Sequence, residues 1–243
     1  MNSKHKLRYL LANVFIIICL FFVSIFWGKI KIQEIEKRYE DKKTIDSLRV
    51  SNRLKEENPE IKIKERLIEI YNFNKYDASI YSAIIFKSSQ RFSIEWEKIA
   101  AKIKVESHFD PFIKSKLTKI LAKEKKQSAY GWLQLKPLTA RECANDLNIE
   151  WNGIPTLYNP ITNTFLGTYY YAKMEVPFKK DFEKSEKAYN VGLTGFYKGY
   201  SSERHWLKVF IEYKKLKGLD FSVEEKKLKK FLKQDTIQVA KKE

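Results

Sequence analysis

The chain has 243 residues, of which 44% are hydrophobic and 14% aromatic, a composition that excludes a wholly disordered protein and suffices for one sizeable folded domain. Its formal net charge of +17 indicates either attraction to polyanions (nucleic acid, anionic lipid headgroups, an acidic wall polymer) or only a solvated lysine-rich surface. The two cysteines and three histidines are scattered, which excludes a zinc-ligand spacing and a Cys/His catalytic arrangement. No cofactor or metal is expected.

Residues 9–27 form an uncharged run rich in Leu, Ile, Phe and Val. As a helix this run spans about 28 Å, the thickness of a hydrocarbon core, so it is predicted to be a transmembrane anchor. The cationic residues Lys4, Lys6 and Arg8 precede it. They place the basic tip, residues 1–8, in the cytoplasm and the rest of the chain outside. The alternative, a cleaved signal peptide, lacks a small-x-small cleavage site. A single-pass protein of the cytoplasmic (inner) membrane, with its main domain in the periplasm, is therefore expected.

Residues 28–75 carry many charges of both signs and only a narrow, broken apolar stripe, which is typical of a helical stalk. From residue 76 to residue 217, broader apolar faces with aromatic residues predict a folded domain. No run alternates with period two, so the predicted fold class is all-α. Residues 218–243 form a basic tail that either contacts the wall or membrane surface or is a solvated amphipathic helix. The predicted helices span residues 78–88, 93–107, 137–147, 161–175, 181–190 and 203–217.

The segment 93–107 is the most informative of these helices, with Ser93 as its expected N-cap. Trp96, Ile99 and Ile103 recur with the spacing of a buried face, and Glu106 is the next position on the same stripe. A carboxylate at this position is paired by a cation, lies in a low-dielectric site, or points to water beyond the helix. In the second case burial favours its protonated form, as a general acid near neutral pH requires.

Further motifs follow along the chain: Glu106–Ser107, Phe109–Pro111, Ala129–Gln134, Asn159–Asn163 and Ala188–Gly192. In this order and spacing, residues 80–200 closely resemble the catalytic domain of the soluble-lytic-transglycosylase family. The resemblance implies a lysozyme-like fold preceded by the anchor and the stalk. It also implies a peptidoglycan lytic transglycosylase, a carbon–oxygen lyase acting on polysaccharide.

The same resemblance makes Glu106 the sole catalytic acid/base. It implies protonation of the β-1,4 glycosidic oxygen between N-acetylmuramic acid and N-acetylglucosamine, then removal of the proton from the C6 hydroxyl. The product is a 1,6-anhydro-N-acetylmuramic acid end. No second carboxylate is implied, because the substrate's own 2-acetamido oxygen stabilises the oxocarbenium-like centre.

The substrate-binding residues implied by the resemblance are Ser115, Gln134, Tyr189 and Asn190. Ser115 matches a serine near the substrate acetamido group, and Gln134 matches a glutamine that lines the cleft. The Tyr189 hydroxyl is expected to approach the catalytic carboxylate. Residues 116–127 depart from the family, because its loop is typically shorter here, and look like a basic insertion. They are expected either to contact acidic stem peptides or wall polymers or to form only a solvated loop.

Three other interpretations remain open. A goose-type muramidase has the same fold but hydrolyses the bond, which requires a further carboxylate; the motifs offer only Asp110, an expected turn residue. A non-catalytic wall-binding scaffold would depend on the stalk and the tail. A nucleic-acid-binding membrane protein is suggested by charge alone, without a recognition motif. The expected partners are peptidoglycan glycan strands and the inner membrane but no nucleic acid; envelope-assembly or division proteins are left open.

Overall fold

The computed structural model of the chain describes residues 37, 40, 58–115 and 127–240. The predicted tip, the anchor at residues 9–27 and nearly all of the basic insertion lie outside the described residues. The chain divides into two compact units, Met1–Asn58 and Pro59–Glu243, and the second contains all the helices named below. Among the described residues, no helix combines the length and apolar character needed to cross a membrane.

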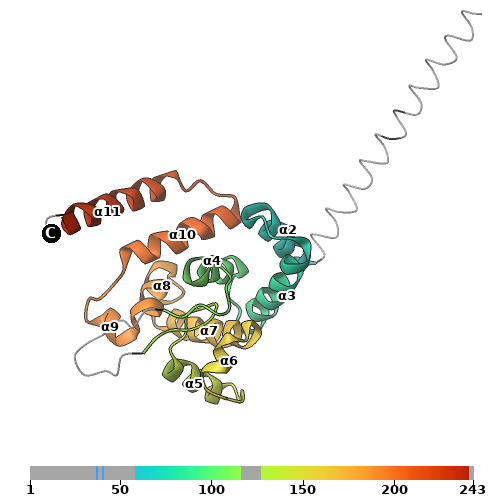
Figure 1. Ribbon diagram of the computed structural model, residues 1–243, viewed down its shortest axis with the longest axis horizontal. Helices are drawn as coiled ribbons and strands as arrows, with labels where there is room; N and C mark the ends of the chain where they lie inside the picture. Colours follow the sequence, from blue (N-terminus) through green and yellow to red (C-terminus); the bar gives the residue numbers. More distant parts are fainter. Residues whose placement is uncertain (1–36, 38–39, 41–57, 116–126, 241–243) are drawn as a thin grey trace, which may run out of the picture. The chain divides into compact units, whose positions relative to one another are not determined.

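The described part of the second unit is built from helices and turns, with only isolated β-bridges, which confirms the all-α prediction (Figure 1). Each of the predicted helices is present, with ends that differ by a few residues. The elements are α2 (Pro59–Tyr71), α3 (Lys75–Phe92), α4 (Trp96–Ser107), α5 (Pro137–Asp146), α6 (Ile154–Tyr158), α7 (Pro160–Glu175), the 3₁₀ helix η1 (Val176–Phe178), α8 (Phe182–Val191), α9 (Leu193–Tyr197), α10 (Glu203–Lys217) and α11 (Ser222–Ala240).

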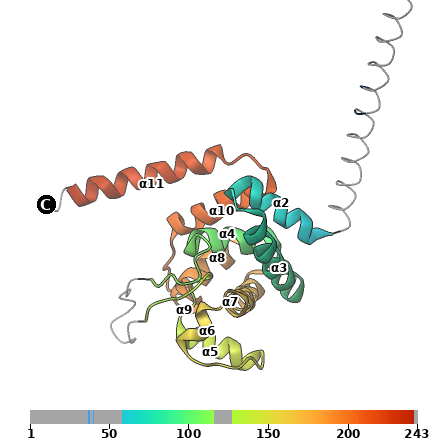
Figure 2. The same cartoon turned by 45° about the vertical axis from the view of Figure 1, so that its right-hand side comes forward.

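Helix α4 is enclosed by its neighbours rather than exposed along one side. It packs against α3 and α10, while α7 packs against α3 and α8, and α8 against α10 (Figures 1 and 2). Every residue from Glu97 to Ile103 is buried, including Lys98 and Lys102. The apolar stripe predicted from the sequence was therefore too narrow, because polar positions of this helix are buried as well.

Ser93 ends α3 instead of capping α4, so the predicted cap was wrong. Its φ of 53° is left-handed, and its backbone N–H donates to the Ser89 carbonyl oxygen, which closes the last turn of α3. The side chain of Ser89 then donates to the carbonyl oxygen of Ile94 (2.7 Å). This reversal buries Ile94, and α4 begins only at Trp96.

Helix α2 corrects the predicted boundary between stalk and domain. Ile63 and Leu67 are fully buried in the core, and α2 packs against α3 and α10. Arg66 donates from Nε to the Leu216 carbonyl oxygen (2.8 Å) and from Nη2 to that of Lys215 (2.5 Å), at the C-terminal end of α10. The folded unit thus begins near Pro59, not at residue 76.

The predicted basic tail contains helix α11, which packs against α10. Gly218, with a φ of 70°, ends α10 at the predicted boundary. Two ion pairs join the helices: Lys214 with Glu224 (2.8 Å) and Lys227 with Glu203 (2.7 Å). The helical alternative for this segment is therefore correct for residues 222–240, while its contact with a wall or membrane stays a prediction.

Replacing Leu67 by alanine tests whether α2 belongs to the core. We expect the free energy of unfolding to fall by about 2–5 kcal/mol, because the change removes buried methyl groups and leaves a cavity. Chemical denaturation of the purified protein measures this. The matched control is Leu138→Ala, at a side chain that is 52% exposed, with an expected change within about 0.5 kcal/mol. Equal effects of the two substitutions would contradict the revised boundary.

Candidate active site

Glu106 lies in the last turn of α4, just before the chain changes direction. His108 and Phe109 both adopt left-handed backbone conformations, with φ of 55° and 66°, and end the helix. Phe109 is buried, and its carbonyl oxygen accepts a hydrogen bond from the indole Nε1 of Trp132 (3.0 Å). The turn that follows Glu106 is therefore fixed by the core, which in turn fixes the position of the carboxylate.

The side chain of Glu106 is 15% exposed and faces a line of charged groups that we call the ionic chain: Glu106, His205, Glu186 and Lys102. His205 Nε2 lies 3.4 Å from Oε1 of Glu106 and 3.3 Å from Oε1 of Glu186. Lys102 Nζ donates to both carboxylate oxygens of Glu186, at 2.8 and 2.9 Å. The Glu186 side chain is fully buried and that of Lys102 is 2% exposed.

The four groups of the ionic chain differ in how readily each is protonated. Burial raises the pKa of Glu106, and the Glu186 carboxylate adds to this, while the positive charges of His205 and Lys102 only partly oppose it. Burial alone would raise the pKa of Glu186, yet Lys102 and His205 together hold it below the ordinary value. Burial disfavours a charge on His205, but the two carboxylates raise its pKa. Glu106 is thus the group most suited to carry an acidic proton.

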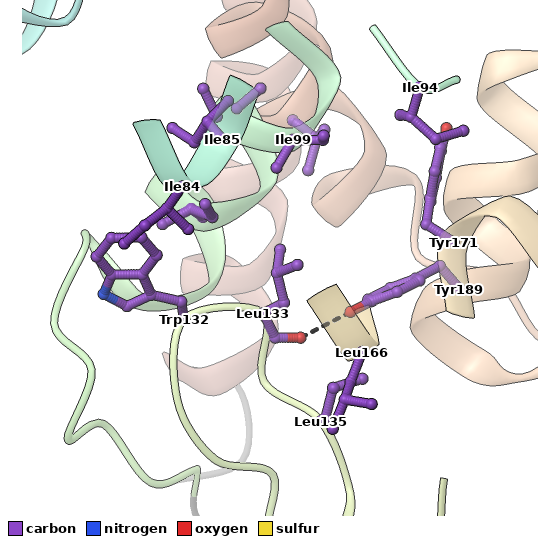
Figure 3. Packing of buried hydrophobic residues seen from close by; sticks show 14 of the residues in the cluster. Ile84, Ile85, Ile94, Ile99, Trp132, Leu133, Leu135, Leu166, Tyr171 and Tyr189 are labelled. Atoms are coloured by element: carbon purple, nitrogen blue, oxygen red, sulfur yellow. Dashed lines mark hydrogen bonds between the residues drawn. The ribbon is translucent and has the colours of Figure 1, made fainter. Parts of the chain in front are cut away.

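Tyr189 lies beside this chain, but its hydroxyl has a different partner from the one expected. The hydroxyl donates to the carbonyl oxygen of Leu133 (2.8 Å), as Figure 3 shows. Its ring lies under Lys102, whose Nζ is 3.4 Å from the ring centroid. Burial, followed by the charge of Glu106, raises the pKa of Tyr189 well above its ordinary value, so the hydroxyl stays protonated. Tyr189 is therefore near Glu106, and it holds the loop of Leu133 rather than the carboxylate.

Gln134 lies in the tight turn that carries Leu133. Its Nε2 donates to the carbonyl oxygens of Gly131 (2.7 Å) and Ile113 (3.2 Å). Gly131 has a φ of 75°, and a Cβ there would overlap the Leu157 carbonyl oxygen, so the turn requires glycine. The amide hydrogens of Gln134 are committed to the turn, which leaves its amide oxygen as the group able to face a ligand.

Asn163 of α7 fixes the same turn from the core. Its Oδ1 accepts from the Leu133 N–H (2.8 Å), and its Nδ2 donates to the carbonyl oxygens of Tyr130 and Leu157, both at 2.9 Å. The side chain is fully buried, so these bonds have no competition from water. One amide group therefore determines where the turn of Gln134 lies.

Ser115 lies in a loop paired with Ala129, and Asn190 lies near the end of α8. Ser115 Oγ accepts from the Ala129 N–H (2.8 Å), and its own N–H donates to the Ala129 carbonyl oxygen (2.9 Å). Asn190 is exposed near the end of α8, before Gly192 with its φ of 76°. The structure brings Glu106 and Tyr189 together and ties Gln134 to them through Leu133. Among the described residues, no hydrogen bond or ion pair joins Ser115 or Asn190 to Glu106.

Sequence reasoning missed Lys102, Glu186 and His205. One signal was available, since Lys98, Lys102 and Glu106 are spaced by four residues and share one face of α4. Lys98 has its own buried partner, Glu175 of α7, at 2.9 Å. The residues that the structure describes contain no group of three or more His, Cys, Asp or Glu able to hold a metal ion.

Replacing Asn163 by aspartate tests its hold on the turn. The change keeps the side-chain size but places a carboxylate against two carbonyl oxygens, so we expect a loss of about 3 kcal/mol or more in unfolding free energy. Thermal and chemical denaturation measure the loss. Asn145→Asp, at an exposed position of α5, is the matched control and should leave stability nearly unchanged. A wild-type stability for Asn163→Asp would show that the turn does not depend on this amide.

Comparison with known proteins assigns a family to this arrangement. The family model described as "Transglycosylase SLT domain" matches residues 83–206. A search of curated proteins finds no significant match.

Among solved structures, the chain is similar to the 70 kDa soluble lytic transglycosylase of Escherichia coli, with 20% identity and a TM-score of 0.45, over 58% of this chain and 25% of that one. It is also similar to an inactive mutant of the lytic transglycosylase Slt of Pseudomonas aeruginosa, with 18% identity and a TM-score of 0.43, over 60% and 24%. The match to a complex of a 70 kDa soluble lytic transglycosylase with bulgecin A has 22% identity and a TM-score of 0.41, over 56% and 21%. The chain thus spans a quarter or less of the length of these proteins.

Proposed function

The chain belongs to the transglycosylase SLT domain family, and we propose that it is a peptidoglycan lytic transglycosylase with Glu106 as its single catalytic acid/base. The observation that carries the proposal is that this carboxyl group, within the matched region, has a raised pKa and a partly exposed side chain. Burial raises its pKa, while a 15% exposed side chain still allows contact with a substrate. A proton donor of raised pKa is what cleavage of a glycosidic bond near neutral pH requires.

The proposed reaction uses Glu106 twice. The protonated carboxyl donates to the glycosidic oxygen between N-acetylmuramic acid and N-acetylglucosamine, and the bond from that oxygen to C1 of the muramic acid breaks. The resulting Glu106 carboxylate accepts the proton of the muramic acid C6 hydroxyl as its oxygen bonds to C1. The products are a free hydroxyl on N-acetylglucosamine and a 1,6-anhydro-N-acetylmuramic acid end, and the enzyme regains its proton.

The remaining site residues are proposed to hold the sugars. The amide oxygen of Gln134 suits a substrate hydroxyl or N–H, since the amide hydrogens bind Gly131 and Ile113. Ser115 accepts from Ala129 and still has a hydroxyl proton to donate, as an acetamido oxygen requires. Asn190 is exposed and has both a donor and an acceptor. Tyr189 contributes indirectly, by holding the turn that carries Gln134.

The muramidase alternative needs a second carboxylate that activates water, and Glu186 is the carboxylate that His205 links to Glu106. Its side chain is fully buried, and both of its oxygens are bound by Lys102. A carboxylate without access to solvent and with a lowered pKa is a poor base for water. This geometry favours the anhydro-forming reaction over hydrolysis. The scaffold alternative does not explain why a buried, proton-holding carboxyl is present in the matched region.

Substituting Glu106 by glutamine tests the reaction and its acid together. Purified peptidoglycan incubated with the wild-type chain should release anhydromuropeptides, which mass spectrometry identifies. We expect Glu106→Gln to reduce the release by at least about a thousandfold, because no other group in the site donates the proton. Reducing-end products from the wild-type protein would indicate a muramidase. Equal release by both proteins would exclude Glu106 as the acid/base.

We further propose that residues 9–27 anchor the chain in the inner membrane and that the unit from Pro59 onward lies in the periplasm, where glycan strands are located. The proposal depends on the uncharged length of this run and on the cationic residues before it. A tethered enzyme of this kind would act on wall close to the membrane, beside envelope-assembly or division proteins. A function in binding nucleic acid has no support beyond the net charge.

The location has a direct test. The full chain should stay in the membrane fraction after carbonate extraction, whereas a chain lacking residues 9–27 should become soluble. Protease added to spheroplasts should digest the folded unit, with a cytoplasmic protein as the intact control. N-terminal sequencing of the extracted chain completes the test: a processed N-terminus would contradict an uncleaved anchor and indicate a signal peptide.

A further inference from the structure

The Lys102–Glu186 ion pair is buried where an ion pair is energetically unfavourable unless it is well partnered. The two side chains are 2% and 0% exposed, and the lysine also lies against the ring of Tyr189. Removing two ions from water is costly, and apolar residues of similar volume often stabilise a core equally well. Stability alone therefore does not explain the pair. The position of the pair indicates a link to the carboxyl group of Glu106, because Lys102 and Glu106 are one turn apart on α4.

His205 connects this pair to the carboxyl group of Glu106. The Ser202 side chain caps α10 and accepts from the backbone N–H of His205 (3.1 Å), which fixes the residue in the first turn of that helix. Nε2 of the imidazole forms a hydrogen bond with Oε1 of Glu186 (3.3 Å) and lies 3.4 Å from Oε1 of Glu106, within ion-pair distance. These similar distances mean that one N–H can be donated to either oxygen with little movement of the ring.

Glu186 determines which ring nitrogen carries a proton. Because Lys102 keeps Glu186 ionised, a bare Nε2 lone pair would face a negative oxygen. The favourable arrangements therefore all place a hydrogen on Nε2, in the neutral ring and in the protonated ring alike. His205 consequently carries a hydrogen on Nε2, which is bound to Glu186 in this structure and lies close to the Glu106 oxygen.

We propose that His205, held by the buried Lys102–Glu186 pair, is a positioning residue that donates from Nε2 to the Glu106 carboxylate formed midway through the reaction. This inference depends on the proposed function. When Glu106 has given its proton to the glycosidic oxygen, its carboxylate lies in a mostly buried site without that proton. The Nε2–H of His205 then stabilises it and keeps its other oxygen directed at the C6 hydroxyl.

The other charged groups around His205 have their own partners. Helix α4 contributes Glu106 and Lys102, and α8 contributes Glu186 and the aromatic Tyr189. These are the groups that face the imidazole in the described part of the site.

In the same turn of α10, Glu203 is bound by Lys187 of α8 (2.6 Å) and Lys227 of α11 (2.7 Å). Helix α2 contacts the C-terminal half of α10, through Arg66 at Lys215 and Leu216 and through Tyr71 at Glu212. The charge on His205 therefore responds chiefly to Glu106 and Glu186.

The pH dependence of activity distinguishes this role from a structural one. Activity is lost as the pH rises through the pKa of Glu106, because the acid form is required. A positive charge on His205 opposes the rise of that pKa. Replacing His205 by glutamine removes the charge but keeps a donor group, so the alkaline limb of the profile should move to higher pH. Loss of the stronger donor should also reduce the rate at the optimum by about tenfold.

The measurement is the initial rate of anhydromuropeptide release by the full chain across a range of pH. His205→Arg keeps a permanent positive charge and should return the alkaline limb towards its wild-type position. His108→Asn removes an exposed imidazole close to Glu106 in sequence, at a left-handed position that asparagine tolerates, and should shift nothing. A lower rate for His205→Gln with an unmoved limb would overturn the proposal and leave a packing role.

A double substitution, Lys102→Met with Glu186→Leu, tests the buried pair without leaving an unpaired charge. We expect the variant to fold, by circular dichroism and thermal denaturation, because both new side chains are apolar and of similar volume. His205 then loses one of the two carboxylates that raise its pKa and carries less positive charge, so the profile should shift in the same direction as for His205→Gln. A folded double variant with a wild-type profile would overturn the part assigned to the pair. Failure of the proposed function is separate, since it would appear as wild-type protein that releases no anhydromuropeptides.

Discussion

The arrangement of this domain depends on the burial of charged residues on its central helix. Helix α4 is enclosed by α3 and α10 and by the helices around them, yet it carries Lys98 and Lys102 among its buried residues. Each lysine needs a carboxylate, and each finds one on a different neighbour, Glu175 on α7 and Glu186 on α8. Because an unpaired buried charge is strongly destabilising, these pairs restrict both the rotation of α4 and the placement of its neighbours. Glu106, one turn further along, is placed by the same restriction.

The turn that carries Gln134 is placed by the same two neighbours. Asn163 of α7 binds it through two hydrogen bonds, to Leu133 and Tyr130, and Tyr189 of α8 donates to the Leu133 carbonyl oxygen. Helices α7 and α8 therefore each bind both α4, through an ion pair, and the turn, through hydrogen bonds. The distance between the acid and the expected sugar-binding turn is consequently set by rigid helices rather than by a loop, as a site with precise geometry requires.

The sequence predicted most of the helices and indicated Glu106 as the candidate acid, because both inferences depend on local patterns. Segments such as α7 and α10 have apolar residues at helical spacing, and Glu106 breaks such a pattern at a recognisable motif. Helix α2 was assigned to the stalk because its buried positions, Ile63 and Leu67, are surrounded by charges. The ionic chain was missed for a different reason: lysine is normally exposed, and its burial at position 102 is decided by a glutamate 84 residues away. The hydroxyl of Tyr189 likewise binds a carbonyl group whose position no motif records.

Glu106 is mostly buried, and ion pairs link Lys102 to it through Glu186 and His205. This combination suits a carboxyl group that changes its ionisation during the proposed reaction. Burial alone raises the pKa of Glu106, which in the proposed reaction favours the acid used in the first step but opposes the carboxylate needed in the second. A cation in direct contact would have the opposite defect, since it would ionise the acid before the substrate arrives. His205 lies between these extremes, because its own charge is shared with Glu186, which is in turn neutralised by Lys102. A donor of adjustable charge can therefore support both states of the same carboxyl group, which explains why the costly buried pair lies one turn from it.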